Sequence, residues 1–305
     1  MKTIKLSLLA ITAASFTLFG CKKDKAPAME TVTDVVLNNP DFTLLARAVS
    51  KAGLADALSN TQNITVFAPN NAAFFSAGLT EAAIDAMDVT TLTNVLTYHV
   101  VPSLVRSTDI ASGSSSAPTL LSNNDVYISN NATGIFINGN SRVVGPDVMA
   151  SNGVIHVIDN IIMPATNNIV EAALATPSLS LLAQAVVKCN LQDALQGAGP
   201  FTVFAPTNAA FEAAGFDAAA IAAASGTTLE TLRNVLLLHV LNGRVFSTDI
   251  NGTINAPTLL EGEQLTATNG TTVSGPGNTT AANIAGANVL VTNGVVHVID
   301  RVLLP

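Results

Sequence analysis

The sequence predicts two consecutive α+β domains that share one internal order of elements. The decapeptide TVFAPNNAAF at 65–74 returns as TVFAPTNAAF at 202–211 with a single change. Within each copy, helix-type periodicity comes before strand-type patterns, and this segregation favours an α+β domain over an alternating one. Three shorter segments recur in the same order: STDI at 107–110 and 247–250, APTLL at 117–121 and 256–260, and NGV-x-HVID at 152–159 and 293–300.

Composition indicates a well-buried chain and narrows the possible partners. The protein has 305 residues, of which 49% are hydrophobic and 11% are charged, so each of two domains can bury a core. The formal net charge is −8, which argues against nucleic acid as a partner because such binding relies on Lys and Arg at phosphates. Cys21 and Cys189 are too few for a disulfide framework. Ala52 takes the place of Cys189 in the first copy, which predicts a small buried side chain there.

Residues 1–20 have the features of a secretory signal peptide. Two lysines precede a mostly apolar run from Leu6 to Phe19, which is too short to span a membrane comfortably. The run ends in Leu-Phe-Gly-Cys, which resembles a bacterial lipobox and implies a lipid on Cys21; an ordinary signal peptide with a chance cysteine is the alternative. We expect a membrane-anchored chain with a tether at 21–28, at the outer membrane or cell surface, with the periplasmic face as a second possibility.

The remaining chain divides into copies at 29–164 and 165–305, and the first elements of each copy are helical. Apolar spacing in the first copy predicts helices near 32–36 and 43–51. A β-branched segment at 63–67 then predicts a strand.

The repeated decapeptide predicts a corner made of a strand, a proline, a helix cap and a short helix. Pro69 ends the strand, and Asn70 or Asn71 can cap the helix that follows; Thr207 or Asn208 does the same in the second copy. Its single change exchanges one good helix cap for another, which a structural corner tolerates. The corner residues expected to be structural are Phe67, Pro69, Asn71 and Phe74, and in the second copy Phe204, Pro206, Asn208 and Phe211.

The later part of each copy predicts one more helix and then strands. Apolar residues and a histidine fall on one face of a helix over 92–99. The segment at 289–298, VLVT-NG-VVHV, predicts a hairpin with a type I′ turn at Asn293-Gly294. The serine-rich run GSSS at 113–116 has no equivalent in the second copy and is interpreted as a loop.

Together these segments resemble the fasciclin domain family. TVFAP-x-NAAF, then L-x-N-V-L-x-x-H-V, then NGV-x-HVID are similar to its signature regions, and TYHV at 97–100 resembles its tyrosine–histidine motif. The resemblance covers about 29–305. It implies two tandem fasciclin-like domains, each a compact β wedge or sandwich with flanking helices, and roles in cell adhesion or extracellular matrix rather than catalysis.

The tyrosine–histidine motif is associated with integrin contact in animal members of that family. This sequence has Tyr98-His99 in the first copy but Leu238-His239 in the second, so the association does not transfer to the second copy. Tyr98 is interpreted as a helix residue with one edge in the core.

All four histidines lie in repeated motifs: His99 and His156 in the first copy, His239 and His297 in the second. Two histidines with Asp159 or Asp300 could form a metal site, but no short His-x-x-His clip supports it. The favoured interpretation is a buried imidazole bonded to the backbone or a carboxylate, without metal or cofactor.

The sequence favours a lipid-anchored adhesion or interaction protein of the cell envelope, contacting a protein or polysaccharide at the surface. We identify no catalytic residue, because no G-x-S-x-G elbow is present. The alternative is an envelope binding protein for a glycan or small ligand, which predicts a pocket lined by aromatic residues. A hydrolase is a distant third.

Overall fold

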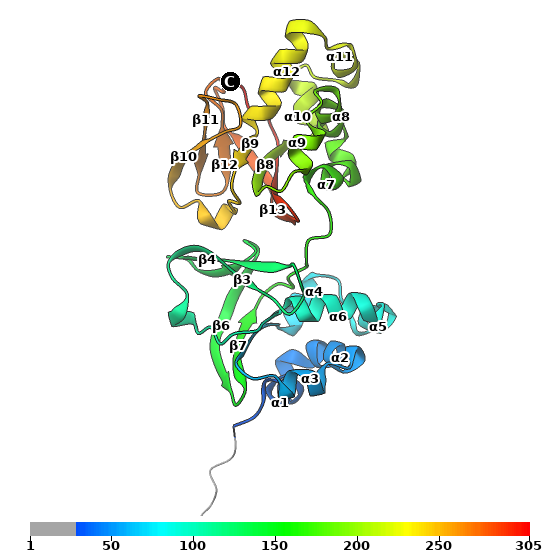
Figure 1. The fold of residues 1–305 in the computed structure, drawn as a ribbon, viewed down its shortest axis with the longest axis vertical. Coiled ribbons are helices and arrows are strands. Elements are labelled where there is room, and N and C mark those ends of the chain that lie inside the picture. The colour runs from blue at the N-terminus through cyan, green and yellow to red at the C-terminus, as the bar shows by residue number, and fades with distance from the viewer. Residues whose placement is uncertain (1–28) are drawn as a thin grey trace, which may run out of the picture.

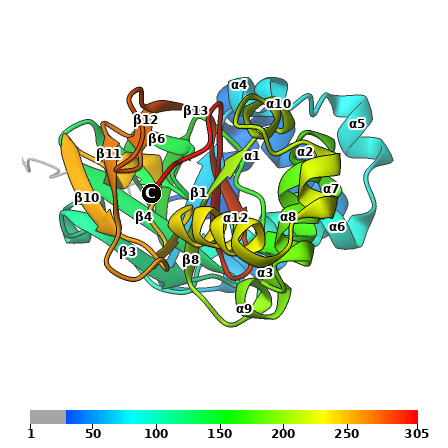
Figure 2. The same cartoon turned by 90° about the horizontal axis from the view of Figure 1, so that it is seen from above.

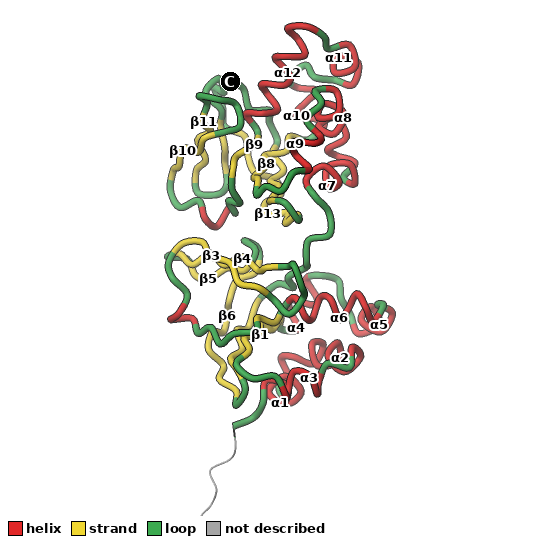
Figure 3. The backbone as a smooth tube through the Cα atoms, in the orientation of Figure 1, coloured by secondary structure: helices red, strands yellow, loops and turns green. Residues whose placement is uncertain are grey.

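The computed structural model describes residues 29–305, which form two domains arranged end to end (Figure 1). The predictions for the signal peptide, Cys21 and the tether lie outside the described residues. In each domain the helices gather on one side and the strands on the other (Figure 3), and a view along the long axis places most helices of both domains on the same side (Figure 2). This segregation confirms the α+β class.

The first domain begins with helices, returns to helices after its first strand, and ends in strands. Its helices are α1 (Val32–Asn38), η1 (Pro40–Phe42), α2 (Thr43–Ala52), α3 (Ala55–Asn60), α4 (Asn71–Ser76), α5 (Glu81–Ala86), α6 (Val89–Tyr98) and η2 (Ser107–Asp109). Its strands are β1 (Ile64–Pro69), β2 (Val100–Val101), β3 (Gly113–Pro118), β4 (Asp125–Asn131), β5 (Gly134–Ile137), β6 (Ser141–Ala150) and β7 (Gly153–Ile158).

The second domain repeats this order. Its helices are α7 (Ile169–Ala175), η3 (Pro177–Leu179), α8 (Ser180–Lys188), α9 (Gln192–Gln196), α10 (Asn208–Ala213), α11 (Ala218–Ala223), α12 (Gly226–Leu238) and η4 (Ser247–Asp249). Its strands are β8 (Phe201–Pro206), β9 (Val240–Asn242), β10 (Thr253–Pro257), β11 (Gln264–Thr268), β12 (Thr272–Ser274), β13 (Ala282–Val291) and β14 (Gly294–Ile299).

The first domain holds one seven-stranded sheet in the order β2-β1-β7-β6-β5-β4-β3, and the second domain has the equivalent order. β1 runs parallel to β7, whereas the remaining neighbours are antiparallel. The long strand β6 changes register against β7 on both sides of Gly145, and such bulges bend a strand and increase its twist. β6 therefore connects two differently oriented parts of the sheet and gives the domain its wedge shape.

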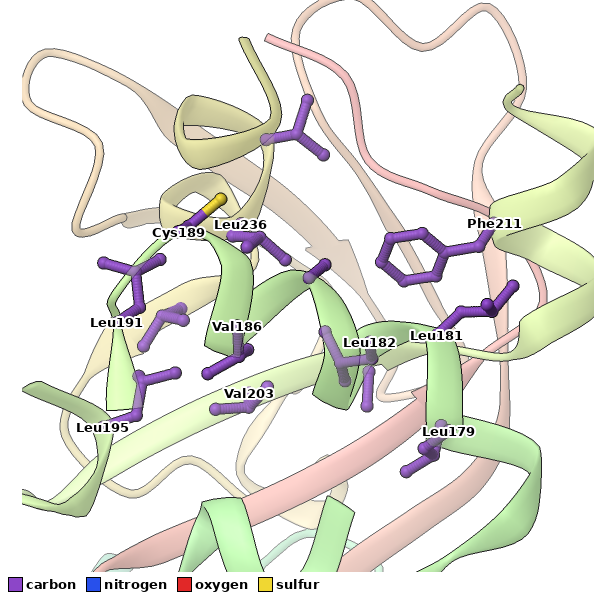
Figure 4. Packing of buried hydrophobic residues seen from close by; sticks show 14 of the residues in the cluster. Leu179, Leu181, Leu182, Val186, Cys189, Leu191, Leu195, Val203, Phe211 and Leu236 are labelled. Carbon is purple, nitrogen blue, oxygen red and sulfur yellow. The ribbon is translucent and has the colours of Figure 1, made fainter. Parts of the chain in front are cut away.

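Each domain has an apolar core between its helices and the β1–β7 or β8–β14 strand pair. β1 is buried along its whole length, as expected of a parallel strand covered on both faces. In the second domain Cys189 is 2% exposed and lies among leucine and valine side chains, including Leu191 and Leu236 (Figure 4). Cys189 thus fills space in the core, and burial raises the pKa of its thiol.

Two local predictions are wrong. The hairpin turn is formed by Thr292-Asn293, because Gly294 is already paired with Val291 as the first residue of β14. Neither Asn293 nor Gly294 has a positive φ, so the turn is not type I′. Glycine is needed at 294 for another reason: a Cβ there would lie 2.1 Å from the carbonyl oxygen of Phe201 on β8.

The serine-rich run at 113–116 is the second error, because it forms part of the edge strand β3. Its residues pair in register with β4, from Gly113 opposite Asn130 to Pro118 opposite Asp125. The side chains of the run are exposed, so its composition resembles a loop while its backbone is fixed by the neighbouring strand.

Candidate functional site

The repeated corner joins β1 to α4 with the geometry that the sequence suggests. Asn70 is the N-cap, and its side-chain oxygen accepts a hydrogen bond from the backbone N–H of Ala73 at 2.9 Å. In the second domain Thr207 caps α10 by accepting from Ala210 at 3.3 Å. Of the alternatives that the sequence left open, the first residue of each pair is therefore the cap.

The second asparagine of the corner has a different role, which sequence reasoning missed. Asn71 donates to the carbonyl of Pro40 at 2.9 Å and accepts from the backbone N–H of Leu44 at 3.1 Å, so it ties α4 to the start of α2. Asn208 makes the equivalent contacts in the second domain, at 3.0 Å each. This clamp needs a donor and an acceptor on one short side chain, which explains why asparagine is kept while the cap position varies.

Phenylalanine and histidine meet on neighbouring parallel strands in both domains. Phe67 on β1 is in register with His156 on β7, and their rings stack with centroids 5.8 Å apart. Phe204 and His297 repeat the pair at 5.4 Å.

The buried histidines use both ring nitrogens. In His99, Nδ1 lies 2.7 Å from the carbonyl oxygen of Val95, and Nε2 accepts from the backbone N–H of Ile162 at 3.2 Å. A carbonyl can only accept and a backbone N–H can only donate, so the ring is neutral with its proton on Nδ1. His239 makes the same two contacts with Val235 and Leu303, at 2.7 and 2.9 Å.

The second histidine of each domain is held in the opposite tautomer. Nε2 of His156 donates to the carbonyl of Val105 at 2.9 Å, and Nδ1 accepts from the backbone N–H of Asp147 at 3.3 Å. His297 repeats this with Val245 and Asn288. Because each nitrogen is occupied, these rings are arranged to hold the backbone together rather than to bind a metal.

Burial also opposes protonation of His99, His239 and His297. Desolvation lowers the pKa of His99 and of His239 to about 4, against the small opposing effect of the backbone carbonyl that each ring contacts. Burial likewise lowers the pKa of His297. At neutral pH these three imidazoles are uncharged and serve the structure.

The two motif aspartates lie apart from the histidines and close a strand pair instead. Asp159 accepts from the backbone N–H of Arg142 at 2.7 Å, and Asp300 accepts from that of Asn283 at 2.7 Å. Among residues 29–305, no three His, Cys, Asp or Glu side chains are placed so that they could hold a metal ion.

Tyr98 is buried, 1% exposed, and its hydroxyl is fully engaged. It donates to the carbonyl of Asp125 at 3.0 Å and accepts from the side chain of Asn138 at 2.9 Å, and burial raises its pKa to about 12. In the second domain the equivalent Leu238 is also buried. The tyrosine of the motif therefore supports the core and offers no free surface to a partner.

Aromatic and cationic side chains meet where the two domains touch. The guanidinium carbon of Arg244 lies 4.0 Å from the centroid of the Tyr127 ring, and the ring of Phe246 lies 5.9 Å from the same ring. A cation over an aromatic face is attractive, more so when both are shielded from water. Leu290 of the second domain also packs against the core of the first.

Polar contacts complete this interface. The side-chain amide of Asn288 donates to the carbonyl of Gly139 at 2.9 Å, and Asn140 donates to the carbonyl of Asn288 at 3.0 Å. Ser129 on β4 donates to Asp249 at 2.6 Å. Together these contacts hold the two domains in one relative orientation.

Sequence reasoning did not find the interface, although a signal was present in the comparison of the copies. At the equivalent positions of the first domain, Leu104, Arg106 and Asp147 stand in place of Arg244, Phe246 and Asn288. The copies are otherwise similar here, and the STDI segment that follows is unchanged. Differences within a retained segment indicate which face of the second domain meets the first.

The helical faces of the domains also differ. An open groove of about 450 Å³ on the second domain is lined by α7, α8 and α11, with Leu174 62% and Val187 44% exposed. In the first domain Arg47 on α2 forms ion pairs with Asp85 and Glu81 on α5. The helical face of the first domain thus carries an ion-pair cluster, whereas the groove on the second is lined mainly by aliphatic side chains together with Gln184 and Lys188.

Among residues 29–305, no single helix is both long and apolar enough to cross a membrane. The pair Ile169–Ala175 and Pro177–Lys188 passes by length and composition together, with a bend of 110° between its two parts.

Comparison with known proteins identifies the family. The fasciclin domain model matches residues 40–164 and again 177–305. The chain is 36% identical over 171 residues to protein sll1483 of Synechocystis, covering 54% of this chain and 88% of that protein. It is 31% identical over 249 residues to the pig transforming growth factor-beta-induced protein ig-h3, covering 80% of this chain and 35% of the relative.

Human periostin is 26% identical over 86% of this chain and 31% of its own length, so this chain spans about a third of these animal relatives. A solved FAS1 domain pair from the insect cell adhesion molecule fasciclin I covers 86% of this chain and 96% of its own, with 18% identity and a TM-score of 0.38. With both copies matched, this chain belongs to the fasciclin domain family.

Proposed function

We propose that this chain is a lipid-anchored adhesion or interaction protein of the bacterial cell envelope. Its two fasciclin domains would act as one body that contacts a protein or polysaccharide at the cell surface. The observation that carries the proposal is the double match to the fasciclin family, a family associated with adhesion rather than with catalysis.

The geometry of the polar residues that recur in both copies supports a structural over a catalytic use. The buried histidines each bind two backbone groups, and the motif aspartates accept from backbone N–H groups of the neighbouring strand. A general base or nucleophile needs a reactive atom within reach of a substrate, and these atoms are already engaged. We infer that the motif residues maintain the domains and that partners bind elsewhere on the surface.

The domain interface supports an adhesive role in a second way. Arg244 and Asn288 fix the second domain on the first, so the pair presents its outer faces in a constant arrangement. When two domains are already fixed relative to each other, less conformational entropy is lost on binding a large partner than when a flexible linker joins them.

The anchor part of the proposal rests on the sequence around Cys21. Intact-mass measurement of the mature N-terminus is expected to show a diacylglyceryl group on this cysteine and cleavage before it. An unmodified Cys21 would contradict the anchor while leaving the adhesion proposal open to its own test.

The adhesion part is tested in cells that lack the gene. Attachment, biofilm formation and cell aggregation are expected to fall and to recover with the full chain. The matched control is the Cys21→Ser chain, which keeps both domains but cannot be acylated and is expected to give no recovery. Unchanged attachment in the deletion strain would refute the proposal.

The pockets of the described residues do not favour the glycan alternative. The groove on α7, α8 and α11 is lined mainly by aliphatic and small side chains, with Gln184 and Lys188 as its longer polar residues and no aromatic ring. The crevice between the domains is lined by amides, hydroxyls and aliphatic groups. Sugar rings usually stack on aromatic faces, and Tyr127, which could offer one, is covered by Arg244 and Phe246.

A further inference from the structure

An apolar cavity of about 240 Å³ lies inside the helical layer of the first domain. It is bounded by α2, α4, α5, α6 and the segment after β7. Engineered apolar cavities of about 150 Å³ stay dry and accept benzene, so this cavity has room for a somewhat larger molecule. Its lining includes Ala48, Phe74, Leu79, Ile84, Met87 and Met163.

The side chains that line the cavity leave no hydrogen-bonding group free for a ligand. His99 is the one polar side chain in its lining, and both its ring nitrogens are engaged with Val95 and Ile162. Within residues 29–305, every buried side-chain nitrogen or oxygen has a hydrogen-bond partner. A buried water needs two to four polar partners, so the lining disfavours water and fits only an apolar group.

The cavity has an entrance formed by flexible side chains. Met163 is 54% exposed, and Met87 and Leu79 are partly exposed, so the cavity lies just beneath the surface. Methionine has three rotatable bonds and adapts easily to a changed neighbour. These partly exposed side chains are the ones through which a ligand would enter.

The second domain has an aromatic ring where the first has Leu79. The backbone N–H of Leu79 donates to the carbonyl of Phe74 at 2.9 Å, and that of Phe216 donates to Phe211 at the same distance, so the positions are equivalent. The rings of Phe216 and Phe211 meet edge to face at 6.2 Å. Phe216 thus packs against the ring that corresponds to Phe74, one of the residues that line the cavity of the first domain.

We propose that the first domain binds an uncharged hydrocarbon group, either a short alkyl chain or a single apolar ring, in the cavity bounded by Leu79, Ile84 and Met163. The second domain lacks this capacity because Phe216 occupies the equivalent space. The site is independent of the adhesive role and of the anchor.

The test is a titration with toluene, followed by methyl NMR of residues 21–305, with Cys21→Ser to prevent acylation. This length keeps both domains whole. Saturable shifts confined to methyl groups around the cavity, such as those of Ile84 and Leu96, are expected. Shifts that do not saturate, or that spread evenly over both domains, would overturn the proposal.

Two variants transfer the residues of the second domain into the first. Leu79→Phe is expected to weaken toluene binding at least about tenfold, since the ring fills the cavity. The double change Leu79→Phe with Met87→Ala also introduces the alanine found at Ala224, and it relieves any crowding that the ring alone creates. Full affinity in either variant, with native circular dichroism, would contradict the assignment.

The matched control lies in the other domain. Phe216→Leu makes the same exchange in reverse and leaves the first domain unchanged. Binding at the Ile84 methyl group is expected to keep its wild-type affinity, and new shifts are expected near Phe211. Loss of the Ile84 response in this control would show that the shifts do not report the proposed cavity.

Discussion

The two domains are alike where residues hold the backbone and differ where side chains face a neighbour or a space. The asparagine clamp of Asn71 recurs at Asn208, and the two contacts of His99 recur at His239. These contacts join elements that are distant in sequence. Their recurrence indicates that each is needed whenever this fold is built.

The differences fall into two groups with separate meanings. Asn288 and its neighbours differ from the first domain on the face that docks against it. Leu79 and Phe216 differ in the helical layer, where one domain has a cavity and the other a packed aromatic pair. Comparing two copies in one chain therefore separates residues that maintain the fold from residues that give each domain its own surroundings.

The largest expected effect tests the difference in core packing. Phe211→Ala removes a fully buried ring that packs against Phe216, and should lower the free energy of unfolding of the second domain by about 3 to 5 kcal/mol. Phe74→Ala is expected to cost the first domain less, because Phe74 already borders a cavity and has fewer packing partners to lose. Differential scanning calorimetry that resolves the unfolding transitions of the two domains would measure both losses of stability. Equal losses in Phe211→Ala and Phe74→Ala would contradict the proposed difference in core packing.

The second prediction concerns what the domains share. The folded-state pKa of His99 and of His239 is about 4, below the value of about 6.5 expected in the unfolded chain. Their neutral form therefore contributes stability that is present above pH 6.5 and is lost as the pH falls toward 4, on the order of 3 kcal/mol for each ring. Both domains should lose stability together over this range in chemical denaturation.

The control for this prediction is a chain with His99→Asn and His239→Asn. Asparagine does not titrate, so the variant should be less stable at pH 7 but lose less stability on acidification. A wild-type unfolding midpoint that stays constant between pH 7 and pH 4.5 would refute the assignment of these rings as buried and neutral.

Sequence patterns predicted the parts of the fold that depend on local chemistry. The helix caps and the α+β order follow from residue types within a few positions of one another, as at Asn70 and Thr207. The prediction of a turn at Asn293-Gly294 was wrong because the glycine is not there for a turn. Glycine is needed at 294 because the backbone of Phe201, a residue far away in the sequence, approaches it closely. The turn propensity of a short segment contains no information about such a long-range contact.

The candidate site was even less accessible to sequence reasoning. The histidines were correctly expected to bond to the backbone, but the partner of each nitrogen depends on loops that sequence alone does not place. The cavity beside Leu79 arises from packing of four helices, which no single segment determines. The double role of Asn71, by contrast, could have been suspected from its constancy beside a variable cap.

The smallest expected effect tests whether Asn288, which stands where the first domain has Asp147, belongs to the domain interface. Asn288 is 3% exposed and donates to Gly139 and Asn140 of the first domain. Asn288→Asp installs the residue that the first domain has at Asp147 and removes these donors, leaving a carboxylate beside a carbonyl. The contact between the domains should weaken by about 2 kcal/mol.

The measurement is the distance distribution between spin labels on the two domains, together with their unfolding midpoints. In Asn288→Asp the distribution should broaden and the midpoints should separate further. The matched control is Asp147→Asn, because Asp147 sits at the equivalent turn of the first domain, where it accepts from Ser107 and faces no second domain. An asparagine at position 147 can still accept the hydrogen bond from Ser107. The left-handed φ of 58° at this position also suits asparagine, so the control should leave the distance distribution unchanged. If both variants broadened the distance distribution equally, the side chain at this position would act on the turn itself. The difference between Asn288 and Asp147 would then carry no information about how the domains dock.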